Sequence, residues 1–94
     1  MRRDWELVLS HEFSQHSSGE LGWSAEWRKH KLTASEVRSR GRAWRLYACE
    51  SFCDTAAWRF SGLEAHDEFT LARTFRRIRR EWFARSIESG PVLI

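Results

Sequence analysis

This 94-residue chain has no long apolar run, few cysteines and few lysines. None of its apolar stretches approaches the roughly 18 residues that a membrane-spanning helix needs, so we expect no membrane association. The opening residues, 1–5, carry charge without an apolar segment behind them, which argues against a signal peptide. We therefore expect a cytoplasmic protein with reduced thiols.

The two cysteines, Cys49 and Cys53, do not form a familiar thiol site. Their spacing is not the C-x-x-C of a redox motif. Structural zinc sites usually show two close pairs of ligands, whereas the four histidines here are scattered. The chain also lacks a P-loop, a G-x-G-x-x-G fingerprint and a nucleophile-elbow pattern. We expect no metal, no cofactor and no enzymatic activity.

Lysine is replaced almost entirely by arginine: two Lys stand against fourteen Arg, and the formal net charge is +3. Arginine forms bidentate contacts with carboxylates and phosphates, and it stacks on aromatic rings. Six Trp and six Phe supply large apolar side chains to a chain that is long enough for a single domain, residues 1–94, with a modest core.

Residues 67–90 carry the clearest helical pattern. Asp67 is a good N-cap, and Gly90 followed by proline is a stop signal. A stripe at helical spacing predicts the buried face of this helix. The stripe consists of Leu71, Phe75, Ile78 and Trp82.

The opposite side of this predicted helix combines basic and aromatic side chains. Arginine with interleaved aromatics is typical of binding hot spots and of phosphate recognition. A solvated charged face is the simpler interpretation. The candidate binding residues are Arg73, Arg76, Arg77, Arg80, Phe69 and Phe83.

Four stretches alternate apolar and polar residues as half-buried β-strands do: 5–13, 21–28, 42–50 and 56–62. We predict an α+β fold, in which a four-stranded antiparallel β-meander carries the long C-terminal amphipathic helix on one face. The core face of this sheet would hold Trp5, Leu7, Leu9, Trp23, Trp27, Trp44, Leu46, Trp58 and Phe60.

Residues 29–41 are predicted to be a loop. Thr33 and Glu36 have the spacing of a capping box, so one turn of helix can begin there. If this segment forms a complete helix, the order of elements becomes ββαββα.

The exposed sheet face and the basic 28–42 segment offer a second candidate surface. Arginine and aromatic side chains on a sheet can stack on bases, although Glu6, Glu12 and Glu26 share that face and repel phosphate. The residues of this surface are Arg28, Lys29, Lys31, Arg38, Arg40, Arg45, Tyr47 and Arg59.

We therefore predict a small non-enzymatic protein-binding inhibitor or adaptor that acts on nucleic-acid-processing machinery. Phage and mobile-element proteins such as anti-CRISPR inhibitors have this size and character, and the likeness goes no further. The alternative is a small basic nucleic-acid-binding domain. A third hypothesis is a small ribonuclease or toxin using His11, Glu12, Arg45, Tyr47 and Arg59. We expect a monomer or homodimer with a protein partner.

Overall fold

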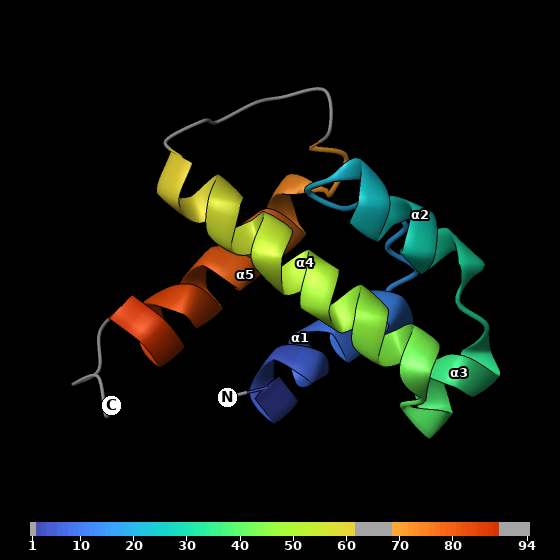
Figure 1. Ribbon diagram of the computed structural model, residues 1–94. Helices are drawn as coiled ribbons and strands as arrows, with labels where there is room; N and C mark the ends of the chain where they lie inside the picture. Colours follow the sequence, from blue (N-terminus) through green and yellow to red (C-terminus); the bar gives the residue numbers. More distant parts are fainter. Residues whose placement is uncertain (1, 62–68, 89–94) are drawn as a thin grey trace.

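The computed structural model describes residues 2–61 and 69–88, and every regular element within them is helical (Figure 1). The predicted α+β fold with an antiparallel sheet is therefore wrong. The elements are α1 (Arg2–Ser14), α2 (Trp23–Lys31), α3 (Ala34–Ser39), α4 (Arg42–Ser61), α5 (Arg73–Phe83) and a π-helical turn, η1 (Ala84–Glu88).

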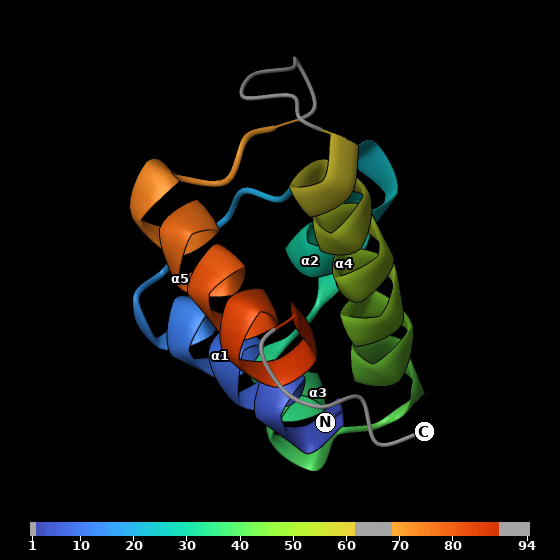
Figure 2. The same cartoon turned by 90° about the vertical axis from the view of Figure 1, so that its left-hand side faces the viewer.

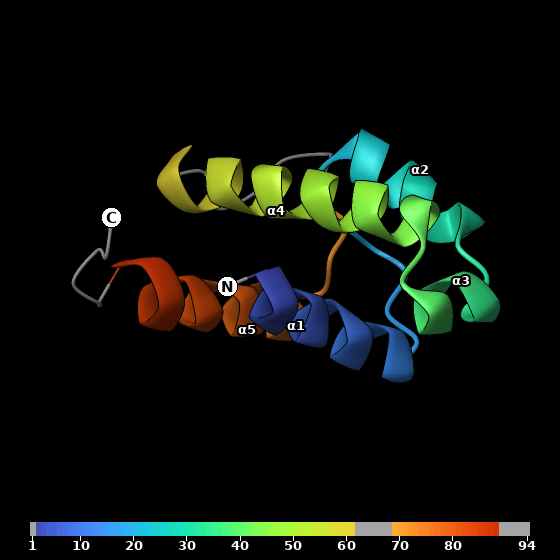
Figure 3. The same cartoon turned by 60° about the horizontal axis from the view of Figure 1, so that its bottom comes forward.

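The helices form two layers. Figure 3 shows α4 with α2 in one layer and α1 with α5 in the other. From the side, α1 and α5 run next to each other and face α4 (Figure 2). Helix α3 lies against α4 at one end of the molecule. The core is the space between the two layers.

Helix α4 explains why the predicted strands 42–50 and 56–62 are wrong. The twenty residues of α4 contain no glycine or proline, and its buried side chains recur every three or four residues. Trp44 and Ala48 fit both a strand and a helix. Ser51 and Thr55 complete the helical stripe, but they are polar and give no apolar signal. The buried residues are Trp44, Tyr47, Ala48, Ser51, Thr55 and Trp58.

The predicted strand at 5–13 fails for the same reason. Trp5 and Leu9 are buried, as either pattern requires. Leu7, which a strand would bury beside them, is 60% exposed. Glu12, one turn further along the helical stripe, is completely buried. Because the buried residue Glu12 is charged, the apolar residues of α1 do not by themselves show the period of a helix.

The C-terminal helix exists, but it is shorter and rotated. It begins at Arg73, whereas the predicted caps, Asp67 and Gly90, lie outside the described residues. Its buried face contains Arg79, Trp82 and Phe83, so Phe83 belongs to the core. The predicted capping box at the start of α3 is confirmed, because Thr33 Oγ1 and the Glu36 carboxylate each accept the other residue's backbone N–H.

Aromatic rings fill the core at the end where α1, α4 and α5 meet. The ring centroids of Trp5 and Trp82 are 5.1 Å apart, and those of Trp5 and Phe83 are 5.8 Å apart. Phe52 of α4 stacks on Phe83 at 5.3 Å. Each such pair adds about 0.5–1.5 kcal/mol beyond the burial of its area.

Candidate functional site

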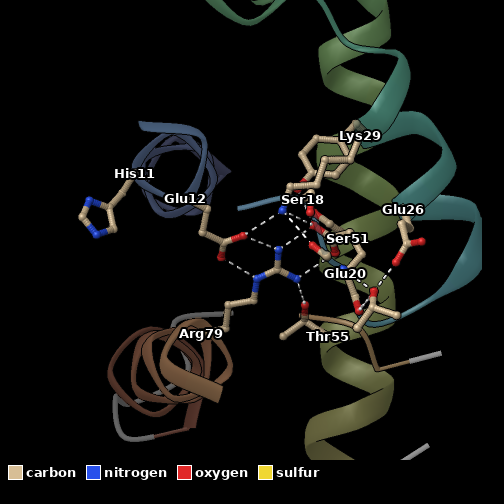
Figure 4. Close-up of polar contacts among 12 residues, drawn as sticks. His11, Glu12, Ser18, Glu20, Glu26, Lys29, Ser51, Thr55 and Arg79 are labelled. Carbon is tan, nitrogen blue, oxygen red and sulfur yellow. Dashed lines mark hydrogen bonds and ion pairs between the residues drawn. The ribbon is translucent and has the colours of Figure 1, made fainter. Parts of the chain in front are cut away.

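Four charged side chains meet inside the core (Figure 4). They are Glu12 of α1, Glu20 of the loop before α2, Lys29 of α2 and Arg79 of α5, and none is more than 3% exposed. We call this set the buried ionic network. It holds two cations and two carboxylates, so its formal charges cancel.

Arg79 uses all five of its N–H donors in this network. Its Nε and Nη2 bind the two Glu12 oxygens, both at 2.8 Å. Its Nη1 and Nη2 bind the two Glu20 oxygens at 2.9 and 2.6 Å. The fifth donor meets Thr55 Oγ1 at 2.9 Å. Two bidentate pairs of this kind are the strongest hydrogen-bonded ion pairs that side chains form.

Lys29 completes the network from the opposite side. Its Nζ lies 3.2 Å from Glu12, 3.3 Å from Glu20 and 2.8 Å from the carbonyl oxygen of Gly19. The ammonium thus has an acceptor for each of its three protons. The hydroxyl of Tyr47 donates a further hydrogen bond to Glu20. Every charged group of the network has hydrogen-bond partners, and this is necessary because a buried charge without partners would destabilise the fold.

These contacts determine the protonation states. Burial alone would raise the pKa of Glu20, but the charges and hydrogen bonds of Arg79, helped by Lys29 and Tyr47, lower it overall. Burial and the charge of Glu20 raise the pKa of Tyr47 well above its usual value. Glu20 is therefore ionised and Tyr47 neutral over the physiological range. Neither group is suited to general acid–base catalysis, which needs a pKa near the working pH.

The network changes the interpretation of several predicted surface residues. Lys29 and Tyr47, predicted to bind a partner, are buried in it. Glu12 of the suggested nuclease set is buried there too, whereas His11 points away from it (Figure 4). The network therefore ties five segments of the chain together from inside. A helical interpretation of 2–14 would have placed Glu12 on the buried face of Trp5.

The predicted arginine face of α5 is only partly exposed. Arg73, Arg77 and Arg80 are exposed, and Arg80 lies over the ring of Trp58 at 4.8 Å. Arg76 is half-buried, and its Nε donates to the carbonyl oxygen of Leu71 at 2.8 Å.

The aromatic members of that face lie elsewhere. Phe83 is in the core, and half-buried Phe69 packs against the cluster of Leu21, Trp58 and Leu71. The predicted mixture of arginine and aromatic side chains is thus not assembled on the outside of α5.

The other predicted set is dispersed over three helices. Arg28 forms an ion pair with Glu50 of α4 at 2.9 Å. Arg40 lies over Trp44 and donates to Ser10 at 2.7 Å, so it joins α3 to the core. The remaining members are exposed Lys31, Arg38 and Arg45, and half-buried Arg59.

Helix α2 carries a surface feature that the strand pattern missed. Trp23 and Trp27 were predicted to be buried in a sheet, but they are 53% and 59% exposed. With Ser24, Arg28 and Glu50 they line an open pocket of about 400 Å³ between α2 and α4, which we call the tryptophan pocket. Their spacing of four residues on one helix was the signal available in the sequence.

Comparisons with protein-family models, curated proteins and solved structures find no match to this chain. The phage origin and inhibitor role predicted from the size of the chain therefore gain no support. Residues 2–61 and 69–88 hold no cluster of three or more His, Cys, Asp or Glu side chains able to bind a metal. None of the helices described in these residues is long and apolar enough to cross a membrane.

Proposed function

We propose that this protein is a non-enzymatic protein-binding domain, and that the tryptophan pocket receives its partner. One observation carries the proposal. The two tryptophans of α2, Trp23 and Trp27, are 53% and 59% exposed, and they line one pocket together. Concentration of exposed apolar side chains on one side of a small domain marks an interaction surface.

The pocket has the composition of a binding hot spot, in which tryptophan and arginine are enriched. Burying the exposed halves of Trp23 and Trp27 would contribute roughly 2–3 kcal/mol. A volume of 400 Å³ has room for a large apolar side chain of a partner. Arg28 and Glu50, which line the pocket, already form an ion pair with each other, so a partner that covers them does not bury an unpaired charge.

The end of α2 suggests the charge of that partner. His30 and Lys31 are exposed in the last turn, and Lys31 Nζ lies 4.6 Å from the ring centroid of Trp27. A cation held over one ring face favours a partner segment that presents an acidic group next to its apolar anchor. A domain of this kind acts as an adaptor or inhibitor by bridging or blocking, in the cytoplasm as the chain's composition suggests. Its target among nucleic-acid-processing proteins stays a prediction.

The test is affinity purification from the native cell with three forms of the protein. We expect wild type and Leu7→Ala to capture the same partner, and Trp23→Ala/Trp27→Ala to lose it. Leu7 is the matched control, because it is an exposed hydrophobic residue on α1. Equal capture by all three forms would show that the tryptophan pocket is not the binding site.

The exposed arginines of α5 favour one second candidate function, nucleic-acid binding. Arg73, Arg77 and Arg80 present three guanidinium groups on one helix. Titration of labelled single- and double-stranded nucleic acid at two salt concentrations tests it. Binding with a steep salt dependence that Arg73→Glu/Arg77→Glu abolishes would support this function, and no binding at low salt would exclude it.

A further inference from the structure

The outward side of α4 carries a regular stripe of its own. Its members follow one another at intervals of four, three, four, three and four residues, which is the a and d spacing of a heptad. All are exposed except Ala56, which is half-buried and packs against the edge of the core. The α4 stripe consists of Arg42, Leu46, Cys49, Cys53, Ala56 and Phe60.

The composition of the α4 stripe is unusual for a surface. A helix that buries one face normally presents polar and charged residues on the other. Here the buried face contains Ser51 and Thr55, and the exposed face is apolar after Arg42. Leu46 is 39% exposed and Phe60 is 64% exposed. An exposed apolar seam with this spacing is the kind of surface that a second helix covers.

The stripe is complementary to itself when two copies run antiparallel. In antiparallel helix pairs, each a residue packs beside a d residue of the other helix. The a positions are Leu46, Cys53 and Phe60, and the d positions are Arg42, Cys49 and Ala56. One two-fold register places Leu46 beside the second copy's Ala56, Cys53 beside its Cys49, and Phe60 beside its Arg42. In this register every residue of the stripe packs beside a residue of the second copy's stripe.

Each of these pairings is physically favourable. A large side chain meets a small one at Leu46 and Ala56, as close packing requires. An arginine over a phenylalanine ring is a cation–π contact, and Arg42 also approaches the C-terminal end of the partner helix, where the helix dipole favours a cation. Arg42 is the only charged member of the stripe, so no two like charges meet at its a and d positions.

The length of α4 is sufficient for a specific dimer. Twenty residues extend about 30 Å. Two helices joined over that length bury accessible surface on the order of 1,000 Å², which is the lower limit for a specific interface. We therefore expect a dissociation constant in the micromolar range.

We propose that the α4 stripe is a homodimer interface, in which two copies pair antiparallel about a two-fold axis that passes between Cys49 and Cys53. None of the residues of the α4 stripe lines the tryptophan pocket. The dimer would carry two such pockets, and the two proposals stand or fall separately.

The two cysteines test the register directly. In the dimer, Cys49 of each copy lies beside Cys53 of the other, while identical cysteines are offset by one helical turn. Mild oxidation should therefore cross-link wild type. Cys49→Ser and Cys53→Ser should each cross-link poorly alone, but a mixture of the two should form covalent dimers in several-fold higher yield. Equal yields from the separate variants and their mixture would overturn the register.

Light scattering or sedimentation measures the dimer itself. Wild type at roughly 100 μM, well above a micromolar dissociation constant, should be dimeric. Phe60→Glu should be monomeric with unchanged helical circular dichroism, and Leu7→Glu should stay dimeric. A wild-type monomer at this concentration overturns the proposal, as does a folded Phe60→Glu that remains dimeric. If Phe60→Glu unfolds, the cross-linking of the mixed cysteine variants still tests whether the α4 stripe forms the dimer. Trp23→Ala/Trp27→Ala should leave the dimer intact, which separates this result from the proposed function.

Discussion

Replacing Arg79 with methionine should remove a large part of the stability of this protein. Methionine keeps much of the length of the side chain and stays apolar, so the change in packed volume is modest. The charge balance is what changes. Glu12 and Glu20 would share only the ammonium of Lys29, and the buried ionic network would acquire a net charge of −1.

The expected magnitude follows from the burial of all the partners. Removing one member of a completely buried ion pair costs about 3–5 kcal/mol, because the remaining charges lose their compensation. A 94-residue domain has a total stability of about 5–14 kcal/mol. The variant should therefore lose roughly a fifth or more of its free energy of unfolding. All five Arg79 donors are hydrogen-bonded in the native state. Its removal therefore eliminates no unsatisfied donor that could offset the loss of stability.

Urea unfolding followed by far-ultraviolet circular dichroism measures this loss. For a denaturant slope of about 1–3 kcal/mol per molar, the midpoint should fall by at least roughly 1 M. The matched control is Arg77→Met on the same helix. The Arg77 side chain is 70% exposed and lies 4.0 Å from Glu81, so its removal should change stability by less than about 0.5 kcal/mol.

The pH dependence supplies a second check. Because the folded pKa of Glu20 is lowered, its stabilisation is present above the unfolded value of about 4.3 and is lost as the pH falls through the folded value. The variant lacks most of this stabilisation. The difference between wild type and Arg79→Met should therefore narrow below about pH 4. A loss under about 1 kcal/mol at neutral pH, or a difference that does not narrow in acid, would refute the reasoning.

Three further predictions rest on other contacts. Tyr47 is the only tyrosine, and its pKa in the folded protein is raised well above the usual value. The absorbance of phenolate should therefore stay absent through about pH 10 and increase only as the protein unfolds. Phenolate absorbance at pH 10 in a protein with intact helical circular dichroism would contradict this prediction. Gly19→Ala should cost about 1–3 kcal/mol in urea unfolding, because its methyl group would strike the backbone of Thr70. Gly41→Ala should be nearly neutral, because its methyl group would meet only Ser39 Oγ, at an ordinary contact distance of 3.5 Å. Acrylamide should quench two of the six tryptophans, and Trp23→Ala/Trp27→Ala should remove that quenchable fraction; unchanged quenching would mean that these rings are not the exposed ones.

The positions of the helices were only partly predictable. A period of two and a period of 3.6 share every fourth residue, so Trp5 and Leu9, or Trp44 and Ala48, fit either pattern. The residues that distinguish the two patterns are buried polar ones. Since an apolar/polar pattern counts Glu12 as a surface residue, the helical stripe of α1 looked interrupted.

The candidate sites were harder to predict than the helices. Trp23 and Trp27 are large and apolar, so any pattern based on hydrophobicity assigns them to a core. Their exposure follows from the rotation of α2, which turns Lys29 inward to meet two carboxylates. That rotation depends on Glu12 and Arg79, which are 17 and 50 residues away from Lys29 in the chain.

Local sequence by itself determined the features that depend on neighbouring residues. Thr33 and Glu36 form a capping box because their side chains reach each other's backbone within one turn, and residues 73–83 are helical as their spacing predicts. Tertiary structure decided which face of each helix is buried. The reason is physical: a charged side chain can occupy a core only when partners from distant segments satisfy all its hydrogen bonds, and only the folded chain brings those partners together.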